Sequence, residues 1–100
     1  MLEELILSEA KEVREKYPQG FNKDKCLDAS YELQQRLLKL GISCSLQFGT
    51  FNKERHSWLD VWIPGGMKLL DVTADQWRDN VPDIIFAKMN EYPQYGWEEN

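Results

Sequence analysis

The chain has 100 residues, 42% hydrophobic and 29% charged, a composition typical of one globular domain with a modest core. The net charge of −5, without a basic run interleaved with aromatic residues, argues against nucleic-acid and anionic-membrane partners. No apolar stretch approaches the length of a membrane span, and the acidic, amphipathic start lacks the features of a signal peptide. We therefore expect a single domain over residues 1–100, in the cytoplasm, with reduced thiols.

The first predicted element is a helix over residues 2–17. Its apolar residues recur at helical spacing, opposite a face of mixed charge: Leu2, Leu5, Ile6, Ala10, Val13 and Tyr17. Such a stripe fits a helix that covers the domain core better than a helix that binds a partner. Pro18 and Gly20 then end the helix and begin a connecting loop.

A second helix is predicted from about Lys25 to Leu40, with Asp24 as its N-cap and Gly41 as its end. The residues of its inner face are spaced by alternating steps of four and three: Cys26, Ser30, Leu33, Leu37 and Leu40. Cys26 thus belongs to the first turn, on the face that carries the buried leucines.

Three strand-like segments follow, at residues 42–51, 56–63 and 67–73. A polar Asn-Lys-Glu-Arg turn joins the first two, and a Pro-Gly-Gly turn joins the next two. A fourth strand is predicted within residues 81–89, before an aromatic and acidic tail rich in turn residues. Helices followed by a meander of strands indicate an α+β domain, with N-terminal helices packed on a small antiparallel sheet.

The two cysteines occur in different patterns. Cys44 alternates with polar residues in the Ile-Ser-Cys-Ser-Leu-Gln-Phe segment, so we interpret it as a small buried residue of a strand. Cys26 has no such strand neighbours. Its place at a helix start favours a lowered thiol pKa, because unpaired amides and the positive end of the helix dipole lie there.

Cys26, His56 and Asp71 form the candidate catalytic set. His56 is the only histidine, and an imidazole beside a thiol can activate it as a nucleophile. Asp71, on the next strand, would hold the imidazole in the useful tautomer. The backbone amide of Cys26 would stabilise a developing oxyanion, with Gln19 of the preceding loop as the candidate second donor.

Strand parity supports the pairing of His56 with Asp71. If Pro64 and Met67 flank a two-residue Gly-Gly turn, Asp71 lies opposite Asp60 and on the His56 face, two pairs short of His56. Contact would then require a bulge, a wider turn or strong twist. Asp60 is the rival orienting acid, but four positions along one strand separate it from His56 by about 13 Å.

These motifs resemble the core of the transglutaminase-like superfamily. A Cys at a helix start is followed by Leu-Gly-Ile before a strand, then by His-Ser-Trp-Leu-Asp-Val and Leu-Leu-Asp-Val-Thr. The resemblance covers residues 20–75 and implies a papain-like fold with a Cys–His–Asp triad in this chain order. It matches the His-x-Trp and Asp-x-Thr strands of that group at His56/Trp58 and Asp71/Thr73.

The resemblance implies a small thiol enzyme that acts on a peptide or protein amide by hydrolysis, deamidation or acyl transfer, without a cofactor. Leu27 departs from the aromatic residue that follows the nucleophile in many papain-like enzymes. A non-catalytic interaction module on the same scaffold is therefore the alternative, and the oligomeric state stays open.

Each candidate residue also has a structural interpretation. Taken singly, His56 would be a surface imidazole, Cys26 a half-buried helix residue and Asp71 a strand acid bonded to a nearby amide. Trp58, Trp62 and Trp77 fit packing better than substrate contact, with Trp58 kept as a substrate-binding candidate. The spacing of the three triad residues matches no zinc motif, so we expect no metal.

Overall fold

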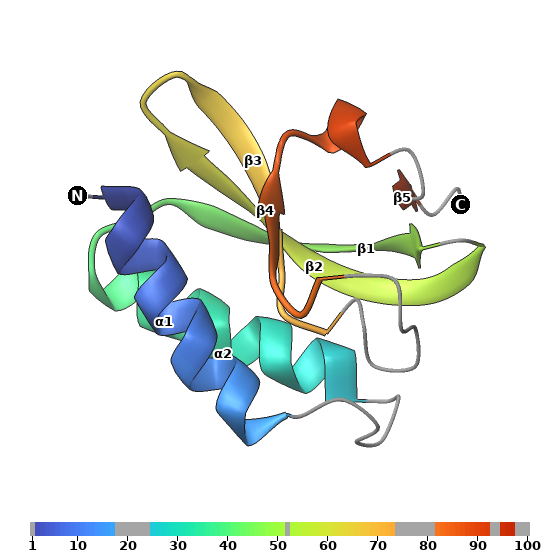
Figure 1. The fold of residues 1–100 in the computed structure, drawn as a ribbon, viewed down its shortest axis with the longest axis horizontal. Coiled ribbons are helices and arrows are strands. Elements are labelled where there is room, and N and C mark those ends of the chain that lie inside the picture. Colours follow the sequence, from blue (N-terminus) through green and yellow to red (C-terminus); the bar gives the residue numbers. More distant parts are fainter. Residues whose placement is uncertain (1, 18–24, 52, 74–81, 93–94, 98–100) are drawn as a thin grey trace.

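A computed structural model of the chain describes residues 2–17, 25–51, 53–73, 82–92 and 95–97. The fold is α+β, as predicted, with two N-terminal helices and a curled, five-stranded antiparallel sheet (Figure 1). The elements are α1 (Leu2–Lys16), α2 (Lys25–Lys39), β1 (Cys44–Phe51), β2 (Glu54–Ile63), β3 (Gly66–Asp71), β4 (Ile85–Ala87), a 3-10 turn η1 (Met89–Glu91) and β5 (Tyr95–Trp97). The strand order in the sheet is β4-β3-β2-β1-β5.

The two helices lie side by side along one face of the sheet (Figure 1). The predicted apolar stripes are buried in part: Ile6, Ala10 and Val13 of α1 and Leu33 and Leu37 of α2, with Ala29, pack against Leu59, Val61 and Leu70 of the sheet. The predicted stripe residues Leu2, Leu5 and Leu40 are exposed, because they lie at the ends of the helices. Helix α2 ends where Gly41 adopts a positive φ of 78°, a conformation that glycine reaches without steric cost. This packing fixes α2, and with it the position of Cys26, over the central strands.

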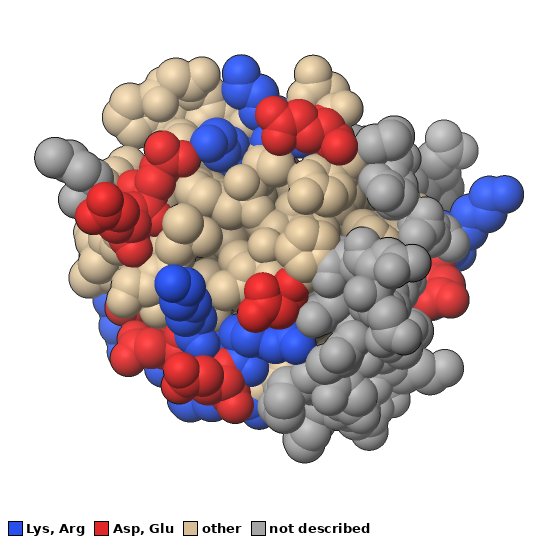
Figure 2. Space-filling model, in the orientation of Figure 1, with Lys and Arg blue, Asp and Glu red and all other residues tan. Residues whose placement is uncertain are grey.

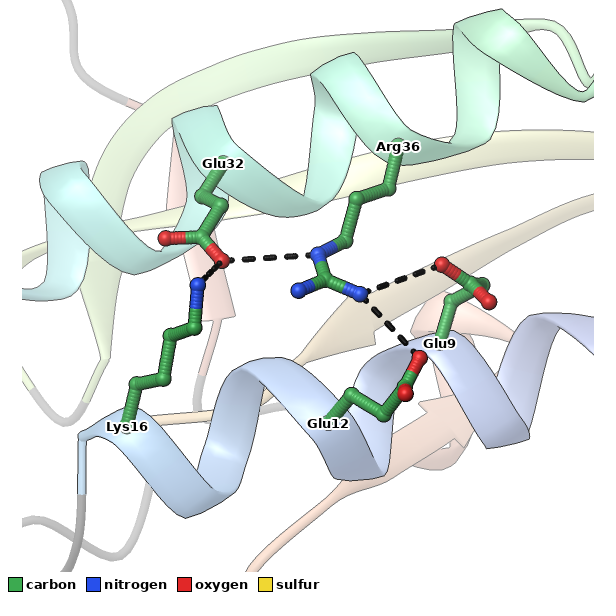
Figure 3. Close-up of polar contacts among 5 residues, drawn as sticks. All are labelled: Glu9, Glu12, Lys16, Glu32 and Arg36. Atoms are coloured by element: carbon green, nitrogen blue, oxygen red, sulfur yellow. Dashed lines mark hydrogen bonds and ion pairs between the residues drawn. The ribbon is translucent and has the colours of Figure 1, made fainter.

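A network of ion pairs joins the solvent-facing sides of α1 and α2 (Figure 3). The Arg36 guanidinium of α2 contacts Glu9 at 3.3 Å and Glu12 at 3.1 Å, both on α1. Glu32, one turn before Arg36, accepts from it at 3.4 Å and from Lys16 of α1 at 2.8 Å. Because one cation bridges two helices, the network favours this alignment of α1 with α2, although exposed pairs stabilise a fold only slightly.

A second, smaller core lies on the opposite face of the sheet. Side chains alternate along a strand, so the neighbours of the helix-facing residues point to this face. Its buried residues are Phe51, Trp58, Leu69, Ile85 and Tyr95, which come from all five strands. The cluster therefore takes a side chain from every strand of the sheet, including β2, the strand that carries His56.

The turn between β2 and β3 differs from the predicted Gly-Gly turn by two residues in register. Ile63 pairs with Gly66, so Pro64 and Gly65 form the turn, with a φ of 99° at Gly65. Proline followed by a left-handed glycine is the sequence preference of a type II turn. Because the β2–β3 register is shifted by two residues from the predicted one, every side chain stays on its predicted face. The shift moves Asp71 one pair closer to His56.

Strand β5 was not predicted, because the tail containing it is rich in turn residues. Its Tyr95 pairs with Phe51 and its Gly96 with Thr50, at the free edge of β1. Only glycine fits at position 49 of β1, because a Cβ there would overlap the Gly96 carbonyl oxygen and lie 2.6 Å from the Trp58 ring. The glycine allows the two backbones to approach closely.

Within the described ranges, no helix is both long and apolar enough to span a bilayer. Acidic and basic side chains are intermixed beside an uncharged area on the face drawn in Figure 2. The net charge of the whole chain is −5, and charges of both signs lie on this face.

Candidate active site

Cys26 lies in the first turn of α2, where the helix packs on β2. The residue is half-buried, between the core and the surface. The first amides of a helix have no partner within the helix, and they place positive partial charge near this thiol. The position therefore combines partial burial with a helix start, two features that affect the pKa of a thiol.

His56 and Asp71 are joined by a short hydrogen bond. His56 Nε2 lies 2.7 Å from Asp71 Oδ2, and both side chains are buried. A carboxylate has no proton to give, so Nε2 donates and Nδ1 is the ring nitrogen left for Cys26. The pairing predicted from strand parity is present. It needs no bulge, because the observed register makes the two residues diagonal neighbours across the β2–β3 pair.

Asp71 is fully buried, and both of its oxygens accept hydrogen bonds. Oδ1 accepts from the backbone amide of Thr73 at 2.9 Å and from its hydroxyl at 3.3 Å. Oδ2 accepts from His56 and from the Tyr95 hydroxyl, the latter at 2.6 Å. Burial acts to raise the pKa of Asp71, but the charge and hydrogen bond of His56, helped by Tyr95 and Thr73, lower it below the ordinary value. The carboxylate is therefore ionised when the site is intact.

His56 carries the opposite shift. Burial acts to lower its pKa, but the negative charge and hydrogen bond of Asp71, with a contribution from Cys26, raise it to about 10. The side chain is only 2% exposed, so water does little to weaken these interactions. At neutral pH the ring is an imidazolium held between a carboxylate and a thiol.

The pKa of Cys26 lies below its ordinary value. Burial acts to raise it, but the hydrogen bond and positive charge of His56 and a backbone hydrogen bond from Ser57 outweigh that effect. The shifts of Cys26 and His56 together favour a thiolate–imidazolium pair, which is the reactive form of a catalytic cysteine. Because the two groups interact strongly, they titrate as a pair.

Ser57 fixes the start of α2 against β2. Its backbone amide contacts the Cys26 sulfur, and its carbonyl oxygen accepts from the Ser30 hydroxyl at 3.3 Å. The pairing of β2 with β3 ends at Leu59 and Leu70, so Ser57 lies beyond the paired part of β3. Two residues of α2, one turn apart, therefore bind the strand residue directly after His56.

Cys44 lies in a different environment. Its thiol is half-buried under α2 and donates to the Gln34 carbonyl at 3.8 Å, in agreement with its predicted place in the core of a strand. Burial raises its pKa, and the described residues place no cation beside it. The pKa of one thiol is thus lowered and that of the other is raised.

Of the other predicted site residues, Trp58 lies beside the triad, with its ring centroid 6.5 Å from that of His56. Trp58 has no exposed surface and packs in the second core, so its ring is not offered to a substrate as the substrate-binding prediction required. Asp60, the rival acid, is buried opposite Leu69 and makes no contact with His56. Leu27 is 40% exposed beside the thiol. Gln19, Asp24 and Trp77 fall outside the described residues.

Sequence reasoning missed two contributors to the site. Tyr95 lies in a tail whose aromatic residues follow neither helical nor strand spacing. Only the pairing of β5 with β1 brings its hydroxyl to Asp71. Ser30 was predicted on the inner face of the second helix, but no pattern in the sequence indicates its bond to the Ser57 carbonyl. In both cases the partner is more than 20 residues away in the chain.

In the part of the chain that the structure describes, no group of three or more His, Cys, Asp or Glu side chains has the arrangement of a metal site. Comparisons of the chain with family models, with curated proteins and with solved structures find no match in any of the three. The geometry of Cys26, His56 and Asp71 is therefore the basis for a functional interpretation.

Proposed function

We propose that the protein is a thiol enzyme that acts on an amide or acyl carbonyl through Cys26, His56 and Asp71. The observation that carries the proposal is the continuous set of contacts from the half-buried Cys26 thiol through His56 to the buried, fully hydrogen-bonded Asp71. The motif order of the transglutaminase-like superfamily supports it, and a papain-like core belongs to the same proposal. The shared arrangement of a nucleophile, a base and an orienting acid is typical of acyl transfer.

In the first half of the reaction, the Cys26 thiolate attacks the carbonyl carbon of the substrate and forms the carbon–sulfur bond. Negative charge develops on the carbonyl oxygen, where the amide of Cys26 at the start of α2 is a candidate donor. The carbon–nitrogen bond then breaks, and His56 gives its Nδ1 proton to the leaving amine. The products of this half are an amine and a thioester on Cys26.

In the second half, water or an amine attacks the thioester carbon while neutral His56 takes the proton from the attacking group. The carbon–sulfur bond breaks, and the thiolate–imidazolium pair forms again. Water as the acceptor gives hydrolysis or deamidation, and an amine gives transfer. Asp71 stays ionised throughout and keeps Nε2 protonated, so that Nδ1 exchanges the proton.

The test compares two thiols of one chain. Iodoacetamide should label Cys26 much faster than Cys44 near neutral pH, because the pKa of Cys26 is lowered and that of Cys44 is raised. Labelling at each position is followed by mass spectrometry of tryptic peptides. His56→Gln should slow the labelling of Cys26 and leave that of Cys44 unchanged.

Equal, slow labelling of both cysteines in the folded protein would exclude the thiol enzyme and favour the alternative, an interaction module on the same scaffold. Cys44→Ala is the matched control, since it removes the ordinary thiol and should leave the rate at Cys26 unaltered. A simple thioester-forming probe, such as an activated aryl ester, then tests acylation directly. Acyl-enzyme should accumulate on Cys26 and be absent in Cys26→Ser.

A further inference from the structure

The C-terminal strand β5 reaches the site through a single hydroxyl group. Tyr95 is buried, and its hydroxyl donates to Asp71 Oδ2 at 2.6 Å, the same oxygen that accepts from His56 Nε2 at 2.7 Å. Its ring packs edge-on against Phe51, at 4.7 Å between centroids, and against Trp58, at 4.9 Å. These ring contacts and the burial of the side chain favour the position in which the hydroxyl reaches Asp71.

Two donors therefore share one carboxylate oxygen. A hydrogen bond to a charged acceptor stabilises that charge, so each donor lowers the attraction that the oxygen exerts on the other donor. We propose that Tyr95 is a positioning residue of the triad, which aims Asp71 at His56 and moderates the hold of the carboxylate on the imidazole proton. This inference rests on the proposed function, in which His56 must both accept and release a proton.

The moderation matters because the proton of the imidazolium must be given to the leaving group. A general acid is most effective when its pKa lies near the working pH, and Asp71 already holds His56 far above that range. Without Tyr95, the full negative charge of Oδ2 would be directed at His56. The imidazolium would then be more stable and a poorer acid.

The groups that face His56 come from five elements: α2, β1, β2, β3 and β5. In the described residues, Cys26 of α2, Asp71 of β3 and the Tyr95 hydroxyl of β5 are the titratable groups beside His56. The Phe51 and Trp58 rings also face His56, at 6.0 and 6.5 Å between centroids. Replacing the hydroxyl alone therefore changes one interaction of Asp71 and leaves the other charges in place.

Tyr95→Phe is the test, because it keeps the ring and removes the hydroxyl. As His56 is the only histidine, its ring nitrogens can be followed without overlap by nitrogen NMR across the neutral and alkaline range. The His56 titration should move to higher pH by about half to one unit, as a lost bond to a charged acceptor predicts. The onset of Cys26 labelling by iodoacetamide should move to lower pH.

The matched control is Tyr92→Phe. Tyr92 is a half-buried tyrosine packed against the same core, and its hydroxyl is not among the donors to Asp71. In this variant, His56 should titrate as it does in the parent chain.

An unchanged His56 titration in Tyr95→Phe, or a shift of it to lower pH, would overturn the positioning role, even if the variant were less stable. If Cys26 is no more reactive than Cys44, the proposed function fails separately, while the His56 titration still tests Tyr95.

Discussion

The Ser30 hydroxyl donates to the Ser57 carbonyl at 3.3 Å, and this bond ties α2 to β2 between the two halves of the reactive pair. Ser30 lies one helical turn after Cys26, and Ser57 directly follows His56. Both serines are buried, so no solvent competes for the bond. A contact that belongs to neither residue thus joins their two elements beside the thiol and the imidazole.

Ser30→Ala should loosen this attachment. The variant loses one buried hydrogen bond and leaves the Ser57 carbonyl without the hydroxyl, at a cost of about 1 kcal/mol in the free energy of unfolding. We expect a several-fold slower labelling of Cys26, measured at one pH with iodoacetamide. Ser8→Ala, at an exposed position of α1, controls for the better helix propensity of alanine. Identical labelling rates in both variants would show that the bond does not position the thiol.

Asp71→Asn should distinguish the role of Asp71 from that of Asp60, the other buried acid of β2 and β3. Loss of the charge beside His56 lowers the pKa of the imidazole, and removing a close opposite charge shifts a pKa by about 1–3 units. Without the carboxylate that accepts from Nε2, the imidazole is no longer held in one orientation against the thiol, so labelling of Cys26 near neutral pH should be several-fold slower than in the parent. Asp60→Asn is the control, because Asp60 is also buried but does not contact His56. Equal effects of the two substitutions would contradict the role of Asp71 as orienting acid.

The stability of the fold should depend on pH on both sides of a plateau. The pKa of Asp71 is lowered in the folded state, so its contribution is complete above the unfolded value of about 3.9 and is lost as the pH falls through the lower folded value. The pKa of His56 is raised to about 10, so its contribution is complete below the unfolded value of about 6.5 and is lost as the pH rises through 10.

Denaturant unfolding at a series of pH values measures this dependence. His56→Gln should remove most of the loss of stability between neutral pH and the alkaline limit, because it removes the group whose pKa shift causes it. A parent chain whose free energy of unfolding is unchanged across that interval would contradict the buried ion pair of His56 with Asp71.

Gly49→Ala should displace β5 from β1. The new Cβ would overlap the Gly96 carbonyl oxygen, which is backbone and cannot rotate away. Amide hydrogen exchange should show lost protection in β5, together with the His56 titration shift expected of Tyr95→Phe. Gly96→Ala is the comparison: its Cβ would lie 2.9 Å from the Thr50 hydroxyl, which can rotate, so its effect should be smaller. A Gly49→Ala protein with β5 still protected would disprove the steric requirement.

Arg36→Ala should lower stability and leave the site intact. Arg36 bridges Glu9 and Glu12 of α1 to Glu32 of α2 in the network of Figure 3. Because the network is partly solvated, we expect a cost of about 1 kcal/mol in the free energy of unfolding, smaller at high salt. The labelling rate of Cys26 should equal that of the parent. A large fall in that rate would mean that the α1–α2 alignment controls the thiol.

Much of the architecture was predictable because it depends on local pattern. The apolar stripes of α1 and α2, the alternation along β2 and the glycines that end α2 and turn β2 into β3 each follow from neighbours a few residues apart. The thiol at the start of α2 and the shared face of His56 and Asp71 were predictable for the same reason. Period and chain order set the face on which a side chain lies.

Register and long-range closure were not predictable from local pattern. Two possible turns at residues 64–67 have nearly the same sequence preference, and only packing of the whole sheet chose Pro64–Gly65 and so brought Asp71 within 2.7 Å of His56. The pairing of β5 with β1, which delivers the Tyr95 hydroxyl, joins segments more than 40 residues apart in the chain. By itself the sequence determined which residue types could form the site. The tertiary structure decided which atoms meet there, because the free energy of such contacts depends on burial that exists only in the folded chain.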